Sequence, residues 1–257
     1  MRPKIVEYYF LLCLKKLKEL SGVAPRLVKL IGKHKEAIHP KHLVQVELPW
    51  YEKYLKKDWL VLDVGCNNGQ HSLRMAKKVK KVVGIDHDRR QLNIALRTKV
   101  KNRCEFVLGD VEYGLPFKDK AFEAVAFFDV LEHLNDDRTI MREIVRVLKK
   151  GGALLLAVPN SETKWKKRQR GLGVDSMADP DHKREYTMSE IRKLINSYNF
   201  EIISKETIVY DTQWEGLINL IGGFSLGLYR KLTQWKKNMV IRFPDESTGF
   251  RIVAVKT

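Results

Sequence analysis

The chain has 257 residues, enough to bury one full-sized core, and an α/β domain of this length need not split. Its three cysteines, Cys13, Cys66 and Cys104, are scattered and odd in number, which argues for a reducing compartment and against a disulfide framework or a zinc site. The apolar run from Ile5 to Leu14 is shorter than the roughly 20 residues that cross a bilayer, and no secretory signal is evident. We therefore expect a cytoplasmic protein, with peripheral attachment at the inner membrane face as a further option.

The net charge is +17, and the excess of basic residues is densest outside residues 58–160. A basic periphery favours an anionic partner, which is either phospholipid or nucleic acid. Solubility alone is the competing explanation of the same charge.

Short apolar runs and helical patterns alternate through the middle of the chain. Continuously apolar runs are typical of strands that are buried on both faces of a parallel sheet, and here they lie at residues 59–64, 81–86, 104–110, 123–129 and 153–159. Between the last two, apolar residues recur at helical spacing over 137–149, and Gly151 is expected to cap that helix. The pattern predicts a Rossmann-like, doubly wound α/β fold with helices on both faces.

The chain after Pro159 has a different organisation. Residues 160–186 are polar and are expected to form a long excursion, and then Thr187 and Glu190 make a capping box that opens a helix to about Tyr198. Two more strands are predicted near 201–209 and 250–256, which completes a seven-stranded, mostly parallel sheet within a domain spanning 51–257.

Two further segments are additions to that domain. Residues 1–50 are predicted to be a basic extension with two partly amphipathic helices, over 5–20 and 24–38. The insertion 212–248 contains the stretch 216–244, which has apolar and basic residues but no acidic one. It is either an interfacial surface that touches a membrane or a lid helix packed on the core.

The first four predicted strands all finish in or just before an aspartate, namely Asp63, Asp86, Asp110 and Asp129. Ligands of open parallel sheets bind beyond the carboxyl ends of the strands. Asp86 follows Gly65 by 21 residues, close to the spacing of an acid that takes ribose hydroxyls. A pocket ringed by acids suits a pyrophosphate poorly. The pattern therefore favours a cationic nucleoside such as S-adenosylmethionine.

These residues resemble the class I S-adenosylmethionine-dependent methyltransferases, and most closely the branch of ubiquinone-biosynthesis O-methyltransferases. The resemblance covers residues 59–160 and rests on five segments in order: VLDVGCNNG (61–69), VVGIDHD (82–88), FVLGDVEYGLPF (106–117), FFDVLEHL (127–134) and LKKGGALLLAVPN (148–160). It implies the fold and the cofactor S-adenosylmethionine, and says little about the methyl acceptor.

The resemblance also implies a set of cofactor-binding residues. The loop around the methionine part comes first, followed by the ribose, adenine and sulfonium contacts: Asp63, Gly65, Cys66, Asn67 and Gly69; Asp86 and His87; Asp110 and Val111; Phe128 and Asp129. Asn67 stands where the family usually has glycine, and asparagine tolerates left-handed geometry. The competing roles are a turn or helix cap for Asp86 and Asp110, and core packing for Phe128.

Methyl transfer to a hydroxyl needs positioning and a general base. We predict His133 as that base, with Asp129 beside it. Two alternatives stay open: His133 and Glu132 brace the next helix, or Asp129, Glu132 and His133 bind a divalent metal, as in related quinone O-methyltransferases. Our expectation is a site without metal. His182 and Arg184 either face the acceptor or brace the Thr187 cap.

The predicted function is O-methylation of a small-molecule, lipid-linked or glycan-linked acceptor, with an anionic membrane surface as a possible partner. The alternative is an RNA methyltransferase that uses the basic stretch 164–170, where Trp165 would stack on a base. Against it stand the absence of an appended RNA-binding domain and a fourth strand that ends in FFDV rather than in an Asn/Asp-Pro-Pro-aromatic tetrad. A binding protein that keeps the fold without catalysis is the third option. The oligomeric state is not predicted.

Overall fold

The computed structural model describes residues 2–31, 40, 49–97 and 103–257. The chain divides into two compact units that interleave along the sequence. The unit that we call the sheet unit comprises Pro49–Asn160, Asp179–Glu206 and Gly249–Thr257. The helical unit comprises Met1–Leu48, Ser161–Ala178 and Thr207–Thr248.

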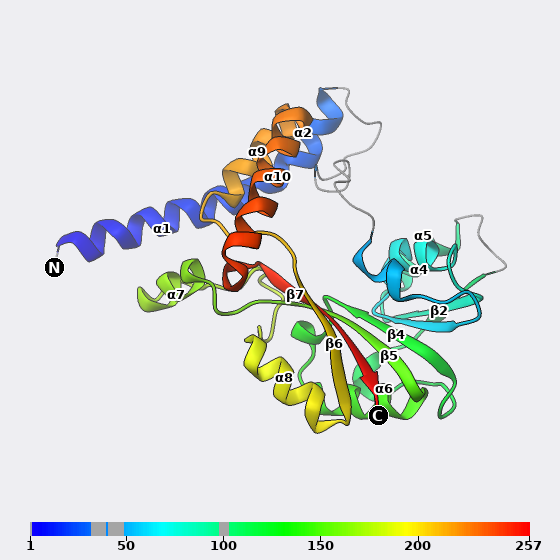
Figure 1. Cartoon of the computed structure of the whole chain (residues 1–257). Coiled ribbons are helices and arrows are strands. Elements are labelled where there is room, and N and C mark those ends of the chain that lie inside the picture. The colour runs from blue at the N-terminus through cyan, green and yellow to red at the C-terminus, as the bar shows by residue number, and fades with distance from the viewer. Residues whose placement is uncertain (1, 32–39, 41–48, 98–102) are drawn as a thin grey trace. The chain divides into compact units, whose positions relative to one another are not determined.

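The sheet unit contains the predicted seven-stranded sheet, with strand order β3-β2-β1-β4-β5-β7-β6 (Figure 1). The strands are β1 Leu60–Val64, β2 Lys81–Asp86, β3 Cys104–Leu108, β4 Phe122–Phe128, β5 Leu148–Pro159, β6 Phe200–Thr207 and β7 Gly249–Lys256. β1 to β5 pair in parallel, and β7 runs antiparallel to β5. The predicted α/β fold with a mostly parallel sheet is confirmed.

Each face of the sheet is covered by its own group of apolar side chains. Alternation along β1 sends Leu62 and Val64 to one face and Val61 to the other. The first face packs against α6 (Asp137–Val147) and α8 (Met188–Ser197), through side chains such as Ile144 and Ile191. On the second face lie the 3-10 turn η2 (Trp50–Tyr54) and α4 (Gln70–Met75), and α5 (Arg89–Leu96) contacts β2 and β3.

Two helix boundaries follow from local capping. The predicted capping box is present: Thr187 accepts a hydrogen bond from the Glu190 backbone, and the Glu190 side chain accepts one from Thr187 N. The predicted cap of α6 is wrong, because the helix ends at Val147 and Gly151 lies within β5. There Gly151 has φ +73°, at an irregularity between β4 and β5 that shifts their register, so its conformation serves the strand rather than the helix.

The sheet reverses its direction of growth between β1 and β4. From β1 the chain continues outward to β2 and β3, and it returns to place β4 on the other side of β1, with Asp63 opposite Ala126. In open parallel sheets, ligands bind beyond the carboxyl ends of the strands at such a reversal, where the loops after the two strands diverge. The predicted strand-end aspartates lie at this carboxyl edge.

The helical unit gathers parts of the predicted extension, excursion and insertion. Its elements are α1 Arg2–Leu20, η1 Ser21–Val23, α2 Ala24–Leu30, α7 Lys164–Gly171, α9 Glu215–Phe224, α10 Leu226–Arg242 and η5 Pro244–Glu246. α9 contacts α1, α2 and α10 (Figure 1). Gly216 permits this packing, since a Cβ there would lie 2.6 Å from the Lys18 backbone nitrogen.

The excursion and the N-terminal extension differ in part from what the sequence predicts. The polar excursion contains the helix α7, which forms because the Thr163 side chain accepts a hydrogen bond from Lys166 N at its start. The second N-terminal helix is present to Leu30, and the rest of its predicted span, 32–39, lies outside the described residues. Among the helices of the described residues, none is both long and apolar enough to span a bilayer. The domain limits 1–50 and 51–257 stay a prediction.

Candidate functional site

The loop after β1 contains three residues in left-handed conformation. Gly65 has φ +72°, Asn67 +48° and Gly69 +74°. A Cβ on Gly65 would lie 2.3 Å from Val130 Cγ2, and one on Gly69 would lie 2.8 Å from the Phe106 ring. The glycines are therefore required by close approach within the protein as well as by the turn. Asn67 takes the left-handed conformation that its residue type tolerates.

Asp86 ties this loop to the end of β2. Its Oδ2 accepts a hydrogen bond from Asn67 N at 2.7 Å, and its Oδ1 accepts one from Asp88 N at 2.8 Å. The Asn67 side chain in turn accepts from Asn68 N at 2.6 Å, so it braces the loop. Each carboxylate oxygen can accept a second hydrogen bond. The turn role and the ribose role of Asp86 are therefore compatible.

Asp63, at the end of β1, and Cys66, within the loop, are both buried. Asp63 is buried, and the Ser72 hydroxyl donates to its Oδ2 at 2.5 Å, which links β1 to α4. Burial raises the pKa of Asp63 to about 7, against the opposing hydrogen bond from Ser72. Burial, with the negative potential of Asp63, also raises the pKa of the Cys66 thiol. The loop is therefore anchored by two buried side chains, Asp63 and Cys66.

The remaining predicted cofactor residues lie along the same edge of the sheet. Asp110 is exposed and accepts a hydrogen bond from Glu112 N at 3.0 Å, which caps the 3-10 turn η3 (Val111–Tyr113). Val111 itself is buried. His87 is exposed, with its Nδ1 3.7 Å from Asp86 Oδ1. Asp129 is exposed and has φ +54°, directly after β4.

An aromatic cluster lies beside the loop, and the sequence analysis did not predict it. Phe128 stacks on Tyr51 with ring centroids 5.0 Å apart, and it meets Trp50 and His71 edge-on. The Tyr51 hydroxyl lies 2.8 Å from His71 Nδ1. Trp50 and Tyr51 lie about ten residues before β1, and no local pattern joins them to Phe128, so only the fold shows that they pack on the residue that ends β4.

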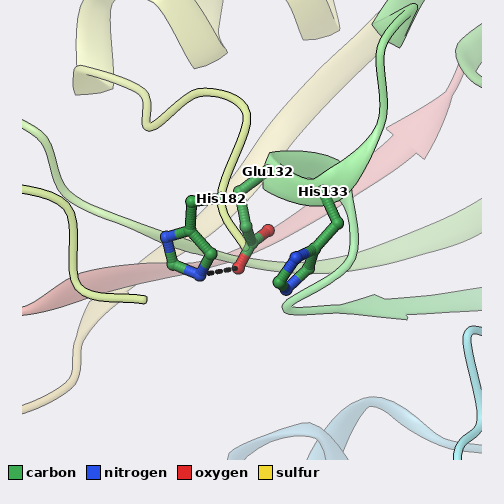
Figure 2. Close-up of side chains that lie close together, drawn as sticks. All are labelled: Glu132, His133 and His182. Atoms are coloured by element: carbon green, nitrogen blue, oxygen red, sulfur yellow. Dashed lines mark ion pairs between the residues drawn. The ribbon is translucent and has the colours of Figure 1, made fainter. Parts of the chain in front are cut away.

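Glu132, His133 and His182 form a second group at the carboxyl edge (Figure 2). Glu132 and His133 come from the 3-10 turn η4 (Leu131–His133), and His182 comes from the segment before α8. The two imidazole centroids are 4.8 Å apart, and His182 Nε2 lies 4.0 Å from Glu132 Oε1. The spacing D-x-x-E-H suggested Asp129 as the third member of such a group. The structure brings His182 there instead.

Electrostatics in this group follow from burial. Glu132 is 1% exposed, and burial followed by the negative charge of Asp129 raises its pKa to about 7. Burial alone would lower the pKa of His182, but a hydrogen bond with Glu185 and the charge of Glu132 raise it. Groups whose pKa lies near neutrality, as that of Glu132 does, are typical of functional sites.

The segment that carries His182 is fixed to Glu132 and to α8. Glu132 O accepts hydrogen bonds from Lys183 N at 2.8 Å and Arg184 N at 3.2 Å. Arg184 pairs with Glu190, the capping-box residue, at 2.7 Å. Arg184 therefore braces the cap, which was one of its two predicted roles, and His182 faces the group at the carboxyl edge.

Comparison with known proteins agrees with this geometry. Residues 62–156, which run from β1 to β5, match the family model described as a methyltransferase domain. These residues therefore carry a methyltransferase domain. The match ends before the excursion, so the helical unit lies outside it.

The chain is also similar to individual methyltransferases. A probable S-adenosylmethionine-dependent methyltransferase of Mycolicibacterium smegmatis is 30% identical over 146 residues, which is 55% of this chain and 52% of that protein. The chain spans about half the length of the curated relatives that it matches. That relative is named for S-adenosylmethionine, the cofactor that the sequence predicts.

Solved structures share the fold. An S-adenosylmethionine-dependent methyltransferase of Methanosarcina mazei superposes with TM-score 0.56 at 23% identity, covering 82% of this chain and 98% of that one. The 4+2 cyclase SpnF superposes with TM-score 0.59 at 20% identity, covering 93% and 94%. At such identities the likeness shows the fold alone, and one of the two proteins is named as a cyclase rather than as a methyltransferase. The fold alone therefore does not identify the reaction, which depends on the residues of the site.

Proposed function

We propose that this chain transfers a methyl group from S-adenosylmethionine to an oxygen of a small-molecule, lipid-linked or glycan-linked acceptor, as the resemblance to ubiquinone-biosynthesis O-methyltransferases implies. The observation that carries the cofactor assignment is the Asp86 carboxylate, which holds the left-handed loop at Asn67 while each of its oxygens can accept one more hydrogen bond.

The residues at the carboxyl edge fit this cofactor. Asp86 would accept the ribose hydroxyls, Asp110 and Val111 would meet the adenine, and the loop from Gly65 to Gly69 would surround the methionine part. Two exposed acids, Asp110 and Asp129, favour a cation over a phosphate at this edge. When bound, S-adenosylmethionine supplies a methyl group activated by a sulfonium. The protein is left with positioning and removal of the acceptor proton.

We assign the removal of that proton to the group around His133. Its Nδ1 lies 3.3 Å from the carbonyl oxygen of Asp181, which orients the ring and leaves Nε2 as the nitrogen for chemistry. Asp129, the other predicted catalytic residue, lies at the end of the same strand and contributes negative charge near Glu132.

The helical unit supports an acceptor with an apolar part and a nearby anionic membrane surface. A hollow of about 360 Å³ between α9 and α10 has a wholly apolar lining, made by Trp214, Leu217, Ile218, Ile221, Leu232 and Trp235. α10 carries Arg230, Lys231 and Lys237 on exposed or half-buried positions. Basic residues beside exposed apolar ones suit an interface with anionic lipid.

The structure weakens the case for RNA. The basic stretch 164–170 forms α7, in which Arg168 pairs with Glu7, Lys167 with Glu162 at 3.1 Å, and Lys164 with Glu246 at 3.9 Å. Lys166 is buried. A stretch whose charges are partly matched by the protein's own acids offers less to phosphate groups.

Two measurements test the proposal. Calorimetric titration with S-adenosylmethionine should show binding that Asp86→Asn weakens strongly, whereas Asp88→Asn should not, since asparagine keeps the cap that Asp88 gives α5. A labelled-methyl assay on cell extract, separated into lipid, RNA, protein and small-molecule pools, should label the lipid or small-molecule pool. Label in RNA alone would replace the acceptor assignment, and binding without transfer to any pool would refute the enzyme.

A further inference from the structure

Glu132 is a buried carboxylate without the partners that such a group needs. Its side chain is 2% exposed, and its Oε2 atom has no hydrogen-bond partner among the described residues. A buried polar atom left unsatisfied costs about 1–3 kcal/mol, and more if it is charged. An unsatisfied group in a native fold therefore points to a strained, catalytic or ion-binding position.

The two neighbouring histidines each use one ring nitrogen to fix their orientation. His182 Nδ1 lies 3.0 Å from Glu185 Oε1, and His133 Nδ1 lies 3.3 Å from Asp181 O. In the tautomer with Nδ1 protonated, Nε2 of each ring has a lone pair available to a cation, and His182 Nε2 lies 4.0 Å from Glu132 Oε1. A carboxylate or carbonyl on the far nitrogen is how proteins hold the histidine ligands of metal ions.

We propose that Glu132, His133 and His182 bind a divalent transition-metal cation of the Zn²⁺ class. One ligand atom from each residue lies within 4.8 Å of the other two, and no other such group of three exists among the described residues. Tetrahedral zinc, with bonds of about 2.0–2.1 Å, holds its ligands about 3.3 Å apart. In Figure 2 the Glu132 carboxylate lies between the two imidazoles, so metal binding would have to draw the three ligand atoms closer together.

The ligand types select the class of cation. Two imidazoles and one carboxylate suit zinc and iron-group ions, whereas Mg²⁺ and Ca²⁺ take oxygen ligands. Three protein ligands also leave a position open, as catalytic sites do and structural sites do not. The site uses no cysteine, which is why the cysteine count gave no sign of it.

The consequence for the reaction rests on the proposed function. With its Nε2 on a cation, His133 would not take the acceptor proton itself, and its part in the proton-removing group of the proposed function would be to hold that cation. The open position of the cation would then lower the pKa of the acceptor hydroxyl in its place. Metal binding itself needs neither S-adenosylmethionine nor an acceptor, so it is measured separately from transfer.

The test is metal binding by the full-length, chelator-treated protein. We expect one equivalent of Co²⁺ or Zn²⁺ to bind by calorimetry, and Co²⁺ to give visible absorption bands typical of low-coordinate nitrogen and oxygen sites. His182→Ala and Glu132→Gln should weaken binding by at least about 10–100-fold, since loss of an outer-shell partner alone costs that much. His87→Ala is the matched control, because His87 lies beside Asp86 without a third ligand among the described residues.

Folding is checked in the same experiment. Zn²⁺ should raise the melting temperature of the wild type and of His87→Ala, but not that of His182→Ala. Absence of binding by the wild type, or equal affinity in His182→Ala, refutes the site and indicates that Glu132 is held neutral by burial instead. Either result leaves the proposed methyl transfer standing, whereas intact metal binding without transfer to any pool refutes only that function.

Discussion

Substituting alanine for Gly65 tests why the first loop has its sequence. The residue has φ +72°, and left-handed geometry costs an ordinary residue about 1–2 kcal/mol. The new Cβ would also lie 2.3 Å from Val130 Cγ2, so Val130 must rotate or the backbone must shift. Overpacking of this kind costs about 1–3 kcal/mol. We expect Gly65→Ala to lower the free energy of unfolding by about 2–5 kcal/mol.

Gly151 provides a matched control, since it has φ +73° and a Cβ added there would meet no described atom within 4 Å. Gly151→Ala should therefore cost only the backbone part, about 1–2 kcal/mol. Urea denaturation followed by circular dichroism measures both variants. Adding Val130→Ala to Gly65→Ala should recover part of the loss as a favourable coupling energy. If Gly65→Ala and Gly151→Ala differ by less than about 0.5 kcal/mol, the close approach to Val130 is not what requires glycine.

Three further predictions concern single side chains. Because the folded pKa of Asp63, about 7, exceeds its ordinary value of 3.8, its protonated form is favoured in the fold, and stability falls as pH rises from about 4 through 7. Denaturation across that range should show a loss of at most about 4 kcal/mol in the wild type relative to Asp63→Asn; parallel curves would contradict the burial argument. Asn67→Gly should be neutral or stabilising and Asn67→Val destabilising by about 1–2 kcal/mol, which thermal melts can compare; a stable valine variant would be evidence against the left-handed turn. Thr187→Ala should cost about 1 kcal/mol and Thr187→Ser much less, and hydrogen exchange in α8 should speed up only in the former.

Most of the fold was predictable from local patterns. Apolar runs located β1 to β5, because strands buried on both faces need continuous hydrophobicity. The capping box located the start of α8, because its two hydrogen bonds involve residues three apart. Boundaries were less accurate: β3 ends at Leu108 rather than 110, and β5 begins at Leu148 rather than 153. Where a strand begins or ends depends on how far its neighbouring strands pair with it, and that is not visible in the local sequence.

The left-handed loop after β1 was predictable, because its residues are close in sequence and their conformations follow from their residue types. Asparagine and glycine are the residue types that most readily adopt the left-handed backbone conformation, so Gly65, Asn67 and Gly69 predict it from the sequence. The Asp86 position follows from strand spacing. What Gly65 avoids was not predictable, since Val130 approaches it only after β4 has paired beside β1.

The sequence by itself determined most elements of this protein and the order of its motifs, because these follow from periodicity, residue chemistry and spacing along the chain. Tertiary structure decided which side chains meet. His182 is 50 positions from Glu132 and no local pattern joins them, but the backbone bonds from Lys183 and Arg184 to Glu132 O bring its imidazole to the buried carboxylate. The same holds for Tyr51 and Phe128, which stack across 77 positions. Long-range contacts are set by how strands and loops pack, and packing is a property of the whole fold.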